Sequence, residues 1–432
     1  MAGLGLTRRR VVAFAGVYGS VALGLAASLV ILRVLGPSGA GRFTIVIAIA
    51  DFLALLVWLT SDDALVKYGF RYAAKEEWGR FRRLIRVAFA SELVASLVAT
   101  ALIVATVPFV DSIFAHESGL EAPLLIAALL PPLQALESIA AATLILGGRY
   151  DLRGTWLTLS MGLRLAGIVV GAQIGVTAAV AGVVVAQAVT TVSILALGFS
   201  ALRGFPSARP APIGHDRGPI IRFVVQSAAY TGLISLRLWV APLALGIVRS
   251  AAEVGLFRAA QMPQSGLAAL SSPLRMILLS EQTRDWEHGR PEVVLAGIRR
   301  YVKGSALIAA VALVPVLTSI PWLVRHVLGA DYLPAVPAAR LILVAAAIQL
   351  VLSWTKTFPV TIGRPGLRLW AHGVETAVML PLIVVLGDRW GVTGAGAAVL
   401  ASSVAFALAW GVILLRLRRS GLSAPSPAPS GS

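Results

Sequence analysis

Long runs of apolar residues follow one another along the whole chain, separated by short polar stretches. A helix that crosses a bilayer needs about 20 mostly apolar residues, and twelve runs approach or exceed this length. The short apolar–polar alternation of a membrane β-barrel is absent. We therefore expect an all-α polytopic membrane protein. The predicted helices span residues 11–32, 43–60, 84–109, 122–146, 155–174, 176–201, 220–247, 255–280, 302–324, 338–359, 366–387 and 391–415.

Composition supports a membrane protein. The chain of 432 residues is 58% hydrophobic and only 13% charged, whereas soluble domains carry about 25% charged residues. The absence of cysteine excludes disulfides, iron–sulfur clusters and thiolate zinc sites, and the five histidines show no metal-ligand spacing. We therefore expect neither a metal nor another cofactor.

Lysine and arginine are concentrated in alternate loops. The net charge is +17, and the positive-inside rule accounts for it without a nucleic-acid partner. With the N-terminus inside, the inner segments hold most of these charges, so both termini are predicted to be cytoplasmic. The run from Val11 to Leu32 is too long for the apolar core of a signal peptide and indicates a retained helix.

The stretches between the apolar runs divide the chain. Residues 75–83 resemble a basic interfacial helix with Trp78 and Phe81 in the headgroup layer. Residues 203–219 contain four prolines and are predicted to link an N-terminal lobe, residues 1–202, to a C-terminal lobe, residues 220–415. Residues 416–432 form a predicted disordered cytoplasmic tail.

The two predicted lobes echo each other. Similar residues recur in the same order at offsets of 214 to 217. The matched pairs are Gly41 and Gly255, Arg82 and Arg299, Pro123 and Pro337, Gly148 and Gly363, and Gly175 and Gly391. Six helices per repeat give both units the same orientation, which implies an axis along the membrane normal. Two such bundles with a cleft between them describe an alternating-access transporter, although a static duplicated bundle is the simpler alternative.

Carboxylates occur inside the predicted helices, where a charge usually faces a cavity or a partner. They are Asp51, Glu92, Glu137 and Glu375. A desolvated carboxylate can carry coupling protons, and a salt bridge to an arginine is an equally good interpretation of each. We select Asp51, Glu137 and Glu375 as candidate ion-coupling residues. Arg33 and Arg86 lie near helix ends, where snorkelling explains them.

Polar residues form stripes on two predicted helices of the C-terminal lobe. The eighth helix carries Arg258, Gln261, Ser265, Ser272 and Arg275, and the seventh carries Arg222, Gln226, Tyr230 and Arg237. These spacings place each set on one helical face. Bonding between helices explains Gln and Ser well, but it explains unpaired arginines poorly. We therefore predict a polar cavity that binds substrate through Arg237, Arg258, Arg275, Arg164, Gln261 and Tyr230.

The repeat offset relates these stripes to the N-terminal half. Adding 214 takes Asp51 to Ser265 and Trp58 to Ser272. Both halves therefore present the same register of their second helix to the predicted cleft. The C-terminal half supplies positive charge, and the N-terminal half supplies Asp51 and the aromatic ring of Trp58.

Four segments carry a family resemblance, at residues 33–43, 252–261, 328–343 and 389–402. They resemble polysaccharide biosynthesis membrane proteins, the Wzx-type flippases of the multidrug/oligosaccharidyl-lipid/polysaccharide (MOP) exporter superfamily. The glycine-rich turn at 33–43 is similar to the turn after their first helix, and residues 252–261 resemble an element of their second half. Residues 328–343 and 389–402 resemble two later elements. The four occur in the family's order along the whole chain.

This resemblance implies two six-helix lobes around a cationic cavity, in a bacterial cytoplasmic membrane. It implies the flipping of undecaprenyl-pyrophosphate-linked oligosaccharides between leaflets, driven by a proton or sodium gradient. The implied partners are the lipid-linked glycan, membrane lipids, and a polysaccharide polymerase or glycosyltransferase. Arginine suits a pyrophosphate because guanidinium binds it bidentately.

Other functions stay open. A drug or cation antiporter of the MATE type would prefer an acidic cavity, and a lipid II flippase of the same superfamily usually has two more helices. An enzyme needs an acidic metal motif or a large external loop. Asp62 and Asp63 form the only Asp pair and are better interpreted as a helix cap. We therefore predict a transporter rather than an enzyme, with a structural partner protein as a further alternative.

Overall fold

The computed structural model describes residues 2–114, 117–270, 282, 285–286, 290–362, 364 and 366–419. Within those ranges every regular element is an α-helix or a short 3-10 helix. Eight helices there are long and apolar enough to cross a membrane, or nine if the bent helix α9 counts as one span. The expected all-α polytopic fold is therefore confirmed.

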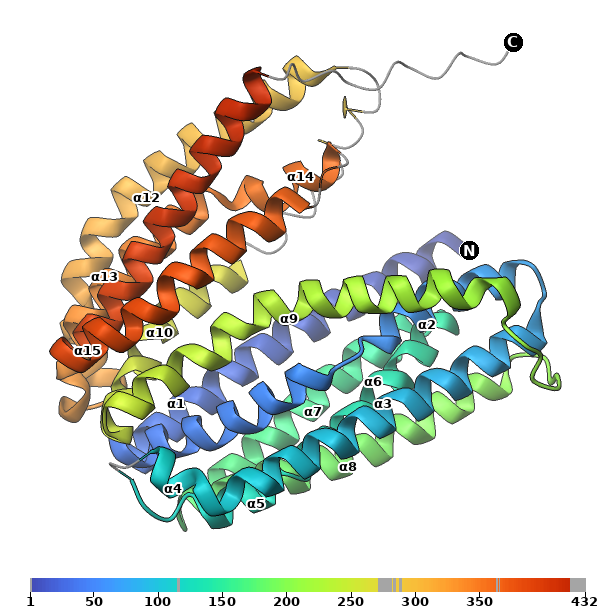
Figure 1. The fold of residues 1–432 in the computed structure, drawn as a ribbon, viewed down its shortest axis with the longest axis horizontal. Coiled ribbons are helices and arrows are strands. Elements are labelled where there is room, and N and C mark those ends of the chain that lie inside the picture. Colours follow the sequence, from blue (N-terminus) through green and yellow to red (C-terminus); the bar gives the residue numbers. More distant parts are fainter. Residues whose placement is uncertain are drawn as a thin grey trace. The chain divides into compact units, whose positions relative to one another are not determined.

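Residues 1–255 form one compact unit in which long helices pack side by side (Figure 1). Its elements are α1 (Ala2–Val57), α2 (Ser61–Ala74), α3 (Trp78–Thr106), η1 (Val107–Phe109), α4 (Val110–Ile113), α5 (Glu121–Ala127), α6 (Leu130–Leu146), α7 (Tyr150–Ala172), α8 (Val176–Arg203), η2 (Gly214–Asp216) and α9 (Arg217–Val248). Helix α7 packs against α1 and α8, while α6 packs against α3 and α8.

Residues 256–432 form the second unit. Helix α10 (Ala251–Leu270) begins just before it. The remaining elements are α12 (Pro291–Val327), η3 (Ala330–Ala335), α13 (Val336–Val351), η4 (Ser353–Lys356), α14 (Phe358–Thr361) and α15 (Gly366–Arg419). Helix α13 packs against α12 and α15.

Helices α1 and α15 are each broken at a glycine. Gly36 has a φ of 67° and Gly391 has a φ of 58°, and neither value fits a helix. These breaks separate the helices that the sequence predicts at 11–32 and 43–60, and at 366–387 and 391–415. Gly391 is the repeat partner of Gly175, which also has a positive φ, of 149°, and directly precedes α8. In both halves, a glycine with a positive φ therefore precedes the last helix.

The two turns that match in the repeat also touch each other. A methyl group at Gly41 would overlap the carbonyl oxygen of Ala251, and one at Gly255 would overlap the carbonyl oxygen of Pro37. Pro37 and Ala251 are themselves 214 residues apart, as are Gly41 and Gly255. The contact is therefore reciprocal, as expected around a two-fold axis.

A carboxylate joins the same two turns. Glu117 accepts a hydrogen bond from Arg42 Nε at 2.7 Å through Oε2, and another from the backbone N–H of Ala251 at 2.7 Å through Oε1. The Glu117 side chain is only 5% exposed. It also provides a partner for one of the unsatisfied N–H groups at the beginning of α10.

The predicted interfacial helix at 75–83 is not present. Residues 78–83 are instead the first residues of α3, after a break at 75–77. Phe81 is fully buried and lies 5.0 Å from the ring of Phe205, and Trp78 lies 5.8 Å from Phe81, measured between ring centroids. The prediction failed because two aromatic residues among arginines are typical of a membrane interface but also of a buried helix beginning. The sequence does not show that Phe205, which is distant in the chain, covers Phe81.

The segment 203–219 is attached to the first unit. The Ala211 N–H donates to the carbonyl of Gly79, and Arg82 donates to the carbonyls of Leu202 and Phe205. Tyr72 donates to Asp216 at 3.1 Å, and burial together with this bond raises the pKa of Tyr72 to about 12. The phenol therefore keeps its donor proton at neutral pH.

Packing and repeat divide the chain differently. Helix α9, predicted to open the C-terminal lobe, packs against α1 and α2 and belongs to the first unit. The six-helix lobes at 1–202 and 220–415 remain predictions about the repeat. Helix α15 continues through Arg419, so residues 416–419 of the expected disordered tail are helical. Residues 420–432 lie outside the described residues.

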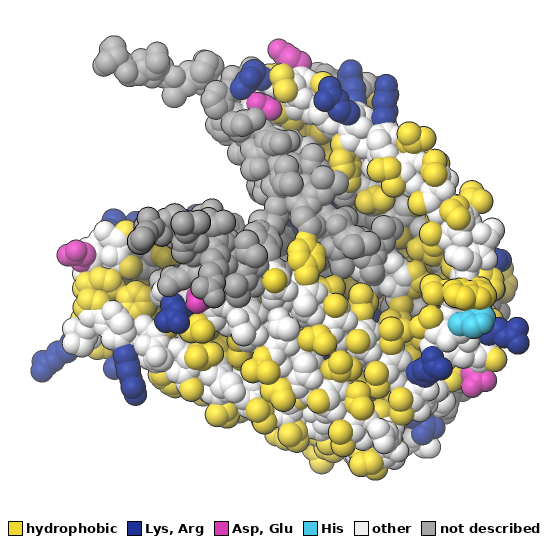
Figure 2. Space-filling view, turned by 180° about the vertical axis from the view of Figure 1, so that it is seen from behind, with side chains coloured by type: hydrophobic (Ala, Val, Ile, Leu, Met, Phe, Trp, Pro, Cys, Tyr) yellow, Lys and Arg dark blue, Asp and Glu magenta, His cyan; other side chains and the backbone are white. Residues whose placement is uncertain are grey.

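The described surface suits a lipid environment. Figure 2 shows hydrophobic side chains over much of one face, with charged side chains few and mostly toward its ends. On α12, Leu307, Val311 and Val314 are each at least 65% exposed. Large apolar side chains in such positions are stable where hydrocarbon replaces water.

Replacing Gly41 or Gly255 with alanine should destabilise the protein, because the added methyl group meets backbone that cannot rotate away. Overpacking of this kind costs on the order of 1–3 kcal/mol or more. Thermal melting of the detergent-purified chain should show lower Tm values for both variants. Gly24→Ala is the matched control, since a Cβ at Gly24 meets nothing within 4 Å, and its Tm should be unchanged or slightly higher. Equal melting of all three variants would contradict the reciprocal contact.

Candidate functional site

A polar cavity of about 920 Å³ lies within the N-terminal unit. Helices α1, α2, α6, α7, α8 and α9 all contribute side chains to it. The charged and amide residues among them are Asp51, Asp62, Asp63, Lys67, Gln134, Glu137, Arg153, Arg164 and Gln187. Burying this many charged side chains inside an apolar helix bundle costs free energy. The cavity is therefore the strongest candidate for a functional site among the described residues.

The break between α1 and α2 brings carboxylates to the cavity. Thr60 adopts a left-handed conformation with a φ of 47°, which is uncommon for a residue other than glycine. The buried Glu92 accepts a hydrogen bond from the Ser61 N–H at 2.7 Å and so stabilises the beginning of α2. Asp62 and Asp63 occupy the first turn, where the helix dipole favours negative charge.

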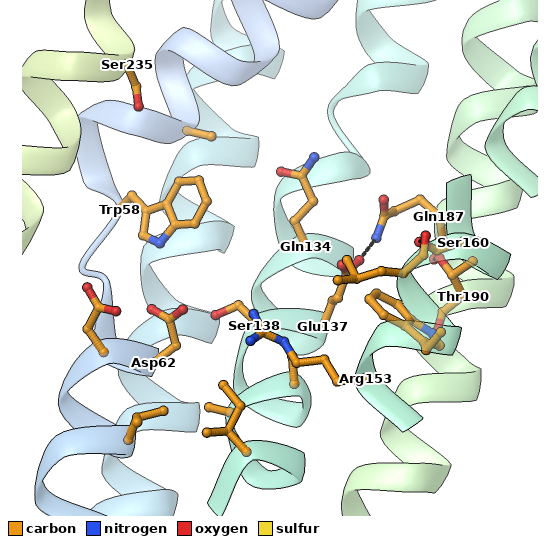
Figure 3. Close-up of a pocket in the computed structure, with 18 of the residues that line it drawn as sticks. Trp58, Asp62, Gln134, Glu137, Ser138, Arg153, Ser160, Gln187, Thr190 and Ser235 are labelled. Carbon is orange, nitrogen blue, oxygen red and sulfur yellow. Dashed lines mark hydrogen bonds between the residues drawn. The ribbon is translucent and has the colours of Figure 1, made fainter. Parts of the chain in front are cut away.

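Arg164 attracts two of the carboxylates electrostatically. It interacts electrostatically with both Asp51 of α1 and Glu137 of α6. Glu137 also accepts a hydrogen bond from the side-chain amide of Gln187 on α8, drawn as a dashed line in Figure 3. One guanidinium group on α7 therefore attracts carboxylates on both α1 and α6.

The other cations of the cavity also have partners. Arg153 extends toward the same region as Asp62 (Figure 3) and attracts its carboxylate. The Lys67 ammonium lies 4.1 Å from the ring centroid of Phe223, which is a cation–π contact. Ser227 donates to Asp63 at 2.7 Å. The cavity is thus mixed in charge and largely balanced, rather than cationic.

Several predicted site residues meet in this cavity. Asp51, Glu137 and Arg164 all line it, and Trp58 lies beside them, as expected from its seven-residue spacing from Asp51. Asp51 and Trp58 therefore share one cavity, and their roles in a cleft between the halves stay predictions.

Other predicted residues lie elsewhere or outside the described part. In the second unit, Arg258 is exposed on α10 and Gln261 is half-buried. Glu375 is buried on α15, where Gln349 donates to it at 2.8 Å and His372 lies 3.0 Å away. The side chains of Tyr230 and Arg237, and all of Arg275, fall outside the described residues, so their roles stay predictions.

Sequence reasoning missed some cavity residues. Gln134 and Ser138 lie on either side of the predicted residue Glu137, and the four-residue spacing between them is a helical pattern that could have been recognised. Gln187 is a single amide in a long apolar run and gave little signal. Asp62 was interpreted as a helix cap, but the N-cap of α2 is Thr60. Asp62 lies in the first turn of α2, and this turn lines the cavity.

The family is identified by a sequence model. The model of the family described as polysaccharide biosynthesis protein matches residues 30–337, which is well over half of the chain. No curated protein sequence matches the chain.

Solved structures agree on the fold. A lipid II flippase, MurJ, in an inward closed conformation superposes with a TM-score of 0.73 at 13% identity, covering 94% of this chain and 87% of that one. An inward-facing MATE multidrug transporter of the MOP superfamily superposes with a TM-score of 0.67 at 14% identity, covering 93% and 95%. This chain is therefore a multi-pass membrane protein that belongs to the polysaccharide biosynthesis protein family and has the fold of MOP-superfamily flippases and multidrug transporters.

Proposed function

We propose that this protein is an alternating-access flippase for undecaprenyl-pyrophosphate-linked oligosaccharide. It would move this lipid from the inner to the outer leaflet of a bacterial cytoplasmic membrane for surface polysaccharide assembly. The observation that carries the proposal is the family match over residues 30–337. The likeness to a lipid II flippase supports it, because that protein too handles a lipid-linked substrate by its name.

Arginines are the proposed ligands of the pyrophosphate. Guanidinium stays charged and binds phosphate oxygens bidentately. In the described cavity, Arg164 is balanced by Asp51 and Glu137, so it attracts an anion weakly while both are ionised. The main attraction is therefore assigned to Arg237, Arg258 and Arg275. Tyr230 and Gln261 would hydrogen-bond the head group or the first sugar.

Ion coupling is proposed to act through Arg164. If Asp51 or Glu137 takes up a proton or binds Na⁺, one negative partner of Arg164 is neutralised. The guanidinium then has a larger uncompensated charge for an anionic head group, so ion binding and substrate binding become linked. Glu375 remains a weaker coupling candidate, because Gln349 and His372 enclose it.

The membrane orientation and partners follow from the same proposal. Both termini would face the cytoplasm, where the lipid-linked glycan is made. A polysaccharide polymerase or glycosyltransferase would act on the lipid before or after it is flipped. No nucleic acid and no cofactor enters the proposal beyond an ion gradient.

A MATE-like cation antiporter is the second candidate, and one observation favours it. Carboxylates of the N-terminal cavity, Asp51, Asp62, Asp63 and Glu137, outnumber its cations, Lys67, Arg153 and Arg164. Such a cavity would accept a cationic drug once its internal pairs open. A lipid II flippase is the third candidate, supported by the MurJ likeness.

Transport assays distinguish these functions. Proteoliposomes of the full chain should flip a lipid-linked oligosaccharide and should not accumulate a cationic dye. Arg237→Ala and Arg258→Ala should each weaken substrate binding roughly tenfold or more, because a hydrogen bond to a charged group contributes about 1.5–3 kcal/mol. Both variants should fail to restore glycan export in cells while they are still expressed. Lys303→Ala, at an exposed position of α12, is the control and should restore it. Dye transport without lipid flipping would reject the proposal.

The coupling model predicts distinct effects in the cavity. Asp51→Asn and Glu137→Gln should remove the stimulation of flipping by a gradient but leave downhill exchange. Arg164→Ala removes the cation that attracts both carboxylates and should lower the Tm. Adding Asp51→Asn to Arg164→Ala should recover part of the lost Tm. If the double variant melts below Arg164→Ala, the pairing of Asp51 with Arg164 is wrong.

A further inference from the structure

An apolar groove lies on the outside of the N-terminal unit, away from the polar cavity. It has a volume of about 260 Å³ and is lined by α3, α6 and α8. Leu136 and Ile139 of α6 face the groove, whereas Glu137 and Ala141 of the same helix face the cavity. Helix α6 therefore separates the two, and the groove is not part of the proposed transport path.

Small residues on α6 and α8 make the groove possible. A Cβ at Gly198 would lie 2.8 Å from the Thr143 hydroxyl, so the two helices approach closely at this point. Ala140 and Thr143 leave space where larger side chains would fill it. Phe199, which lines the groove on α8, is 58% exposed, and Val192 on the same helix is 67% exposed. The groove thus opens on a surface that is apolar and suited to acyl chains.

One charge lies in this apolar groove. Arg86 lines it and is exposed, and no acidic residue lines it. Among the described residues Arg86 has no hydrogen bond or ion pair, in contrast to Arg82, which donates to carbonyls of the 202–206 segment. An arginine without a protein partner on a lipid-facing surface needs an anion from the membrane or water.

The position of Arg86 sets the depth of that anion. It lies eight residues into α3, about 12 Å from Trp78 at 1.5 Å per residue. Two further exposed arginines lie at this end of the groove. Arg83 is near the beginning of α3, and Arg203 is the last residue of α8. The predicted orientation places these ends in the cytoplasm, so the groove extends from the inner interface into the inner leaflet.

We infer that this groove binds an anionic phospholipid of the inner leaflet, with its phosphate on Arg86 and one acyl chain between α3 and α8. Basic sites between membrane helices on the cytoplasmic side suit anionic headgroups, and guanidinium pairs with phosphate in two-point contacts. The volume is below the usual 300–1,000 Å³ of pockets for drug-sized ligands, so it accommodates one chain rather than a whole lipid. This site does not depend on the identity of the transported substrate.

Native mass spectrometry of the detergent-purified full chain tests the site. Phosphatidylglycerol should bind more tightly than phosphatidylcholine with the same chains. Arg86→Ala should weaken phosphatidylglycerol binding roughly tenfold and remove this preference, and Arg86→Lys should retain most of it. Arg83→Ala is the matched control, because Arg83 is exposed on the same helix but does not line the groove.

A second pair of variants tests the acyl-chain position. Leu195→Trp should occlude the groove and reduce binding of both lipids, whereas Val192→Trp, one turn away and outside the groove, should not. A Tm measurement for each variant separates a filled groove from a misfolded protein. Equal losses in Arg86→Ala and Arg83→Ala would overturn the inference. Displacement of phosphatidylglycerol by a polyprenyl phosphate at equal concentration would also overturn it and assign the groove to a carrier lipid.

Discussion

Contact between backbones at two glycines organises the N-terminal unit. In a bilayer, apolar surface gains little by leaving lipid for protein, so helices associate through close packing, which small residues permit. Gly41 against Ala251 and Gly255 against Pro37 provide such packing twice, in symmetric form. Glu117 adds a charged hydrogen bond on each side of the same contact. The reciprocal pattern also agrees with the repeat, because adding 214 to the residue numbers of one contact partner gives a partner in the other contact.

The polar cavity shows how a membrane protein keeps charges that it cannot solvate. Its cations each face an acidic or aromatic partner, and the helix break at Thr60 supplies two of the acidic groups. An uncompensated charge of either sign would be costly there. A charged ligand or ion in this cavity would therefore compete with the protein's own charged side chains for partners.

The helices were predictable because a membrane span leaves a long apolar run, and glycine turns such as Gly36 and Gly391 stand out between runs. The register of Asp51 and Trp58 was predictable for a related reason, since seven residues are close to two helical turns. The packing of Phe81 was not predictable from the sequence, because its contact with Phe205 forms only when the chain folds. The balance of charge in the cavity was also not predictable. Arg153 lies between the predicted helices 122–146 and 155–174, and Gln187 is a single amide in a long apolar run.

The attachment of α9 to the first unit has a consequence for the order of synthesis. The predicted N-terminal repeat ends before residue 220, but the first unit includes residues up to 255. Domains generally fold as units during translation, with the N-terminal part first. The ribosome must therefore complete the first helix of the second repeat before the first unit can finish packing. During that interval the N-terminal repeat is inserted but incomplete, and the surface that later receives α9 is open to chaperones and to other chains.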